Sequence, residues 1–216
     1  MSLHSFLFLP CLALVAGVYY ALPQKYRYIW LCAASLFFYL SGDVRFALGL
    51  AFCTGTTYLT ALLLDREGAG GRAIAKGILG VCAALQVLAL FLFRYPWASS
   101  PFVPLGISFY ALQAMGYVVE VYRGHVRAER NPVRYAAYVS FFPTVMSGPI
   151  QRAQGLLAQL REGRAFDYGR AHSGLYLLLW GYLLKFVIAN PLGGMVDFAY
   201  GNYEDMPGAA LLWATI

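Results

Sequence analysis

The sequence predicts an all-α polytopic membrane protein with about six spanning helices, one re-entrant segment and one short interfacial helix. Three observations lead to this fold class. First, 60% of the 216 residues are hydrophobic and 12% are charged, whereas roughly a quarter of a soluble domain is charged. Second, uncharged runs recur along the whole chain, and a bilayer is spanned by about 20 apolar residues. Third, short charged loops separate these runs.

Six apolar runs are expected to span the membrane. The first could be mistaken for a secretory signal peptide, but it lacks a basic start and a small-residue cleavage site, and many apolar runs follow it. The second is slightly short, and its Tyr28 and Trp30 suit a membrane interface. The predicted runs are Phe6–Leu22, Tyr28–Gly42, Phe46–Leu64, Gly77–Phe93, Phe102–Val121 and His172–Ala189.

Basic residues alternate between the loops. The loops after the first, third and fifth runs hold two, three and four Lys or Arg residues, and the other two hold one each. Since Lys and Arg are retained in cytoplasmic loops, this predicts a multi-pass protein of the cell membrane with its N-terminus outside. The net charge of +6 would suggest nucleic acid in a soluble domain. Here cationic loops facing membrane lipid explain it, so lipid is an expected partner and nucleic acid is not.

The stretch Tyr135–Gln151 is uncharged but does not fit a plain spanning helix. It contains Pro143 and the break Ser147–Pro149, and arginines flank it on both sides, whereas a spanning helix should have its positive charge mainly on one side. We therefore expect it to enter the membrane from the cytoplasm, break and return. Such backbone is tolerated only where protein or a water-filled cavity surrounds it, so a cavity is expected here. The flanking residues are Arg123, Arg127, Arg130, Arg134, Arg152, Arg161, Arg164 and Arg170.

Two features follow this stretch. Gln151–Phe166 places leucines on one helical face and arginines elsewhere, which is typical of a short helix in the cytoplasmic interface. The sixth run is expected to lead outward to a loop that holds Asp197 and two further acidic residues but no Lys or Arg. The last run, Ala209–Ile216, is too short to span. We therefore expect residues 1–216 to form a single transmembrane domain, the N-terminal part of a longer one, truncated inside a helix.

No motif of a soluble enzyme identifies a reaction. HExxH, nucleophile-elbow, P-loop and dinucleotide-binding patterns are absent. The four cysteines fall in different apolar runs without CxxC or Cys/His pairing, so we expect small core residues and neither zinc nor disulfides. His4, His125 and His172 are expected at a frayed terminus, in a solvated loop and near a helix end, respectively.

Three charged residues are of particular interest. Lys185 lies in an apolar run and is either functional or snorkels to the outer interface from near a helix end. Glu120 is expected to pair with Arg123. Arg152, just after Pro149, either contacts an anionic group at a cavity mouth or is a plain cytoplasmic positive charge.

Several short motifs, in their order and spacing, resemble those of the membrane-bound O-acyltransferases. The resemblance is closest to the bacterial branch with the alginate O-acetylation proteins and the D-alanyl transfer protein of teichoic acid synthesis, and it covers nearly the whole chain. Each motif is weak alone, but the set is specific. The motifs are Leu36–Tyr39, Leu105–Tyr110, Gly116–Gly124, Phe141–Pro143, Ser147–Arg152 and Leu184–Leu192.

The resemblance implies a ring of helices around a central tunnel, which an acyl donor enters from the cytoplasm and an acceptor from outside. The resemblance implies that the family's catalytic histidine lies in a later part of the protein. It matches none of the three histidines here, so no catalytic residue is expected in this chain. No metal site is expected either, because Cys/His pairing is absent. No bound cofactor is expected, since the donor is a thioester substrate, either acetyl-CoA or an acylated carrier protein. The residues implied to line the tunnel or donor entrance are Phe142, Pro143, Ser147, Gly148, Pro149 and Arg152.

The function expected on these grounds is transfer of an acetyl or D-alanyl group to hydroxyls of an exported cell-surface polymer. The 216-residue chain alone is expected to be inactive, and an extracytoplasmic acyltransferase is a further partner that the resemblance allows. A transporter or channel is an alternative, because broken helices also build transport sites, although no inverted repeat is visible. A non-catalytic scaffold of an acylation complex is another alternative.

Overall fold

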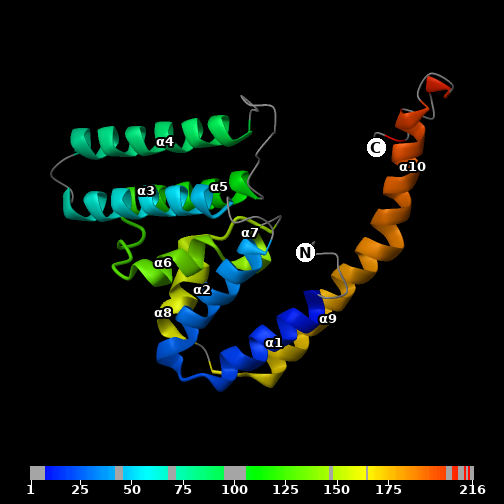
Figure 1. Ribbon diagram of the computed structural model, residues 1–216, viewed down its shortest axis with the longest axis horizontal. Coiled ribbons are helices and arrows are strands. Elements are labelled where there is room, and N and C mark those ends of the chain that lie inside the picture. The colour runs from blue at the N-terminus through cyan, green and yellow to red at the C-terminus, as the bar shows by residue number, and fades with distance from the viewer. Residues whose placement is uncertain are drawn as a thin grey trace. The chain divides into compact units, whose positions relative to one another are not determined.

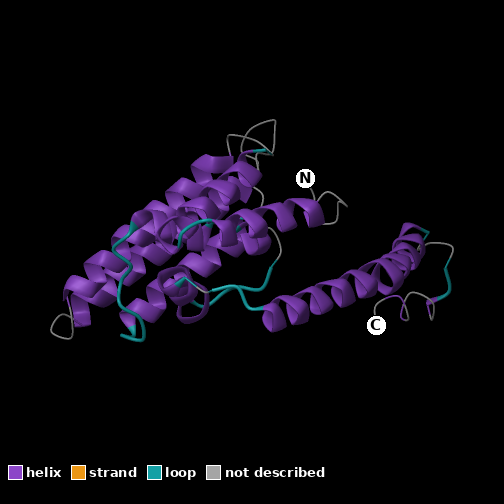
Figure 2. Cartoon of the chain, turned by 90° about the horizontal axis from the view of Figure 1, so that it is seen from below, coloured by secondary structure: helices purple, strands orange, loops and turns teal. Residues whose placement is uncertain are grey.

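The computed structural model is helical, and it describes residues 8–41, 46–67, 72–94, 106–145, 148–163, 165–202, 206–208, 212 and 214. Within this described part there are helices and loops but no strand (Figure 2). The chain divides into two compact units, Met1–Arg164 and Ala165–Ile216. The predicted all-α class is thereby confirmed, and each unit is described by itself.

Three helices in the described part are long and apolar enough to cross a membrane, within Phe46–Arg66, Ala73–Phe93 and Tyr168–Gly201. Their length and composition support a helical membrane protein. Three other helices coincide with predicted runs but have only 14, 17 and 16 residues: α1 (Phe8–Ala21), α2 (Gln24–Leu40) and α5 (Ile107–Tyr122). A helix of 16 residues rises about 24 Å, less than the roughly 30 Å of hydrocarbon. The count of six spans and the ring around a tunnel therefore stay predictions.

The first unit is built on α3 (Phe46–Glu67), which packs against both α4 (Arg72–Arg94) and α5 (Figure 1). Small buried residues such as Cys53, Ala61 and Ala114 lie in this core, and small residues let apolar helices approach closely. α2 packs against α6 (Pro132–Val139), and α6 packs against α8 (Ala153–Glu162).

The cysteine prediction holds for three of the four positions. Cys32, Cys53 and Cys82 are buried in the first unit, whereas Cys11 is exposed on α1. Cys11 lies in an apolar run like the others, but within the described part of the first unit no residue buries it.

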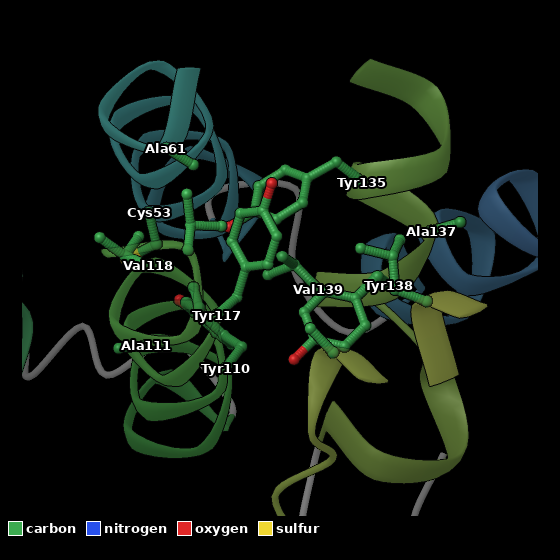
Figure 3. Packing of buried hydrophobic residues seen from close by; sticks show 14 of the residues in the cluster. Cys53, Ala61, Tyr110, Ala111, Tyr117, Val118, Tyr135, Ala137, Tyr138 and Val139 are labelled. Atoms are coloured by element: carbon green, nitrogen blue, oxygen red, sulfur yellow. The ribbon is translucent and has the colours of Figure 1, made fainter. Parts of the chain in front are cut away.

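Three fully buried tyrosines join α5 to α6 (Figure 3). The Tyr117 and Tyr135 rings lie 4.7 Å apart, and Tyr138 lies 6.1 Å from Tyr135. Each hydroxyl has a polar partner: Tyr117 Oη accepts from the Glu129 N–H, and Tyr135 donates to Thr57 Oγ1, both at 2.8 Å. Buried tyrosines contribute apolar area while their polar ends are satisfied, which matters most where water is absent.

The second unit contains one continuous helix over Tyr168–Gly201. It comprises α9 (Tyr168–Leu183), the π-helical turn η2 (Leu184–Ala189) and α10 (Asn190–Gly201). The sequence places the end of this run at Ala189 with Asp197 in an outer loop, and both predictions are wrong because Asp197 lies within α10. Lys185 consequently lies near the middle of the helix, which removes the basis for snorkelling from a helix end.

Candidate donor entrance

The broken stretch Tyr135–Gln151 forms two short helices followed by an irregular connection. α6 has eight residues and α7 (Phe142–Val145) has four, so neither can cross a bilayer that takes about 20 residues. The predicted interruption is therefore confirmed. Ser147 lies outside the described residues.

α7 is anchored to α2 by its first residue. The Phe142 N–H donates to Ser35 Oγ at 3.2 Å, and the Phe142 ring lies 5.6 Å from the ring of Phe38. Pro143 follows in the first turn, where a helical N–H has no partner within the helix and its loss costs little. Phe142 is thus a buried packing residue, and Pro143 is half-buried beside it.

The backbone at position 148 passes so close to Thr144 of α7 that only glycine fits there. Its N–H donates to the Thr144 carbonyl at 3.1 Å. A Cβ at this position would lie 2.5 Å from Thr144 Cα and 2.9 Å from Thr144 Cβ. A side chain therefore cannot be added here without moving the connection away from α7.

The connecting segment Pro149–Arg152 is fastened by two residues of the preceding helices. Gln113 Nε2 donates to the Tyr138 carbonyl at 2.8 Å, and Gln113 Oε1 accepts from the Gln151 N–H at 3.3 Å. The Tyr138 hydroxyl donates to the Gln151 carbonyl at 2.7 Å. Both backbone groups of Gln151 thereby have hydrogen-bond partners within the protein.

The two flanks of the broken stretch meet at a buried carboxylate. Glu129 Oε1 accepts from Arg134 Nη1 at 3.1 Å, and Glu129 Oε2 accepts from Arg161 Nε at 2.6 Å. We call these three residues the Glu129 cluster. Arg134 precedes Tyr135–Gln151 and Arg161 follows it, so both flanks lie at one place, as a segment that returns to its side of entry requires.

Burial and pairing act in opposite directions on Glu129. Burial alone would raise the pKa of this carboxyl. Hydrogen bonds from Arg161 and the Asn131 N–H, with the charges of Arg161 and Arg134, outweigh burial and lower the pKa of Glu129 below its usual value of 4.5. Favourable contacts to the ionised form have this effect, so Glu129 is a carboxylate at neutral pH.

Other sequence-based expectations at this site need correction. Among the described residues, Glu120 makes no ion pair with Arg123, and its Oε2 atom is buried without a hydrogen-bond partner. The sequence predicts that Leu156, Leu157 and Leu160 of α8 face the membrane interface. In the structure Leu157 and Leu160 are buried in protein, and Leu156 is partly buried. The helix itself is confirmed at Ala153–Glu162.

A half-open cavity of about 340 Å³ adjoins the connecting segment. It is lined by the loop after α5 and by α8, including Ala153, the residue directly after Arg152. The six residues implied by the resemblance are not among its lining residues. Pro149 and Arg152 are exposed, and a tunnel role for any of the six stays a prediction.

Sequence reasoning missed the residues that hold this site together. Gln113 was the one with a visible signal, because it is a polar residue inside an apolar run and such residues tend to bind within the protein. Tyr138 and Glu129 carry no comparable signal, since their partners are distant in the sequence.

The chain is similar to bacterial proteins named as O-acetyl-transferring enzymes. It is 31% identical, over 97% of its residues, to the probable alginate O-acetylase AlgI of Pseudomonas aeruginosa and to that of Azotobacter vinelandii. It is 26% identical, over 84% of its residues, to the peptidoglycan O-acetyltransferase of Helicobacter pylori. It spans 43%, 45% and 42% of these relatives, less than half of each. No family model and no solved structure matches the chain.

The Gly148 contact predicts a matched pair of substitutions. Gly148→Ala should lower the free energy of unfolding by about 1–3 kcal/mol, because the added methyl group overpacks against Thr144. Gly155→Ala in α8 should be neutral or stabilising, since no atom lies within 4 Å of its Cβ position and Ala favours helix. Thermal melting of the intact protein in detergent measures both. Equal melting temperatures of the two variants would show that Gly148 is not in close contact with Thr144.

The Glu129 cluster predicts a pH dependence. Because the folded pKa is lowered, its stabilisation is complete above the usual value of 4.5 and is lost as the pH falls through the lowered pKa. Glu129→Gln should destabilise the protein by about 1–3 kcal/mol at neutral pH and should flatten the acid limb of melting temperature against pH. The exposed Glu162→Gln serves as control. An unchanged acid limb in Glu129→Gln would refute the assignment.

Proposed function

We propose that the intact protein is a membrane O-acetyltransferase, which the similarity of the chain to these relatives supports. Its acceptors are hydroxyls of an exported cell-surface polysaccharide or of peptidoglycan. The observation that carries this proposal is the similarity to two differently named O-acetyl-transferring enzymes over most of the chain. Both names specify acetyl, which favours acetyl over D-alanyl as the transferred group.

The reaction is transfer of an acyl group from sulfur to oxygen. The acceptor hydroxyl oxygen attacks the thioester carbonyl while a base takes its proton, and the C–S bond breaks to release a thiol that regains a proton. The donor is acetyl-CoA or an acylated carrier protein. The residues of this chain supply walls and an entrance, and the family's catalytic histidine has no counterpart among the histidines here.

In this proposal the entrance is formed by Tyr135–Gln151 and the adjoining Arg152. The Glu129 cluster supports re-entry of this stretch from the cytoplasm, because residues on both flanks of the stretch bind the same carboxylate. The exposed Arg152 side chain is suited to an anionic group of the arriving donor. The N-terminus then lies outside the cell membrane, and an extracytoplasmic acyltransferase is a candidate partner.

The activity is tested in cells. Deleting the intact gene should remove ester-linked acetate from the cell-surface polymer, measured as acetate released by mild alkali, and re-expression should restore it. Arg152→Ala should lower acetylation by roughly tenfold if one charge-assisted contact to the donor is lost, whereas Arg123→Ala should not. Identical acetate in cells with and without the gene would end the proposal.

The topology has a separate test. In a variant with Cys11 replaced by serine, Arg123→Cys and Gln159→Cys should both react with a membrane-impermeant thiol reagent only after the cytoplasmic side is opened. Both positions are exposed in the structure, and they lie on opposite flanks of the broken stretch. Labelling of the two from opposite sides of the membrane would show that the stretch crosses it.

A further inference from the structure

The cavity beside the connecting segment has a basic wall. Its loop side contains His125 and Arg127, and its α8 side contains Gln154, Leu157 and Arg161. We call it the basic pocket. No acidic residue is among its lining residues.

The charges around the basic pocket do not cancel. Glu129 is shared by Arg134 and Arg161, which leaves one positive charge in that cluster. Asp65 approaches the same loop, where it accepts the Ala128 N–H at 3.4 Å. Arg127 offsets this charge, and in the described part no ion pair or side-chain hydrogen bond engages its guanidinium. Among the residues that line the pocket, Arg127 and Arg161 are cationic and none is acidic, so the lining itself is positively charged.

The pocket offers more than charge. Ala153 and Gln154 are the first two residues of α8, and the first N–H groups of a helix have no partner within it and favour an anion. Arginine presents a planar set of donors that matches a phosphate. Val126 and Ala158 line the pocket and are partly exposed, so they offer an apolar surface. A volume of about 340 Å³ lies in the range of small-molecule sites rather than of a lone inorganic ion.

We propose that the basic pocket binds a phosphate ester, with the phosphate between Arg127 and the start of α8 and the organic part against Val126 and Ala158. Two sources have this chemistry: the headgroup of an anionic phospholipid, and a soluble phosphorylated thioester donor, the second of which rests on the proposed function. The pocket begins one residue after Arg152, so a donor held here would lie at the proposed entrance.

Binding is measured on the intact protein purified in detergent, with dioleoyl phosphatidylglycerol in mixed micelles and coenzyme A as two separate probes. Arg127→Gln should weaken binding of the occupant by roughly tenfold, the effect of losing one charge-assisted contact. Arg130→Gln is the matched control, since Arg130 is an exposed arginine of the same loop outside the pocket lining. Gln154→Trp, which fills the pocket without changing its charge, should weaken binding as well.

Saturable binding of either probe that Arg127→Gln and Gln154→Trp weaken, and Arg130→Gln does not, supports the proposal. Binding of phosphatidylglycerol alone would identify a lipid site. Binding of coenzyme A alone would identify a donor site. Binding of neither probe, or equal binding by Arg127→Gln and Arg130→Gln, would overturn it. Polymer acetylation is measured separately in cells, so that loss of the proposed activity with intact probe binding rejects the function and leaves the pocket standing.

Discussion

The position of the broken stretch within the first unit depends on the pairing of Glu129. A buried carboxylate is costly unless charges and hydrogen bonds satisfy it, and here Arg134, Arg161 and the Asn131 N–H do so. The partners come from the start of α6 and the end of α8, so one carboxylate fixes both flanks of the broken stretch. The cluster extends further, because the Arg134 guanidinium lies 4.9 Å from the centre of the Tyr28 ring on α2. Removing Glu129 would therefore loosen three helices at once.

With its flanks fixed, the broken stretch needs its interior backbone satisfied as well. Asn131 caps α6 by accepting the Val133 and Arg134 N–H groups at 3.0 and 3.2 Å. Ser35 binds the first residue of α7, and Gln113 binds Gln151 after it. Irregular backbone at membrane depth is stable only when protein supplies such partners. A donor entrance built from this stretch would consequently be preformed, with the Gln151 backbone held from two sides.

The sequence was sufficient where the signal is local. Apolar runs located α3 and α4, and Pro143 with Gly148 located the interruption, because these residues act on their own backbone. The sequence was insufficient where interacting residues are distant along the chain. Arg161 is 32 residues from Glu129, and no local pattern predicts that Glu129 rather than Glu120 is the paired carboxylate. The leucines of α8 show a third limit. Their spacing predicts a helix with one apolar face, but the same spacing serves a face covered by lipid or by protein, and here protein covers it.

Two prolines show that a proline in an apolar run does not by itself tell whether the helix ends there. Pro143 stands in the first turn of α7, where no N–H is missed, and the helix ends two residues later beside Gly148. Pro191 also lacks an N–H, yet the helix passes through it, because the preceding turn widens and the Asn190 N–H reaches back to the Lys185 carbonyl. Such π-type turns often mark functional positions, and Lys185 is the ionisable residue in this one. The outcome at each proline therefore depends on its position in the helix and on the hydrogen bonds of the neighbouring turn, which the proline itself does not specify.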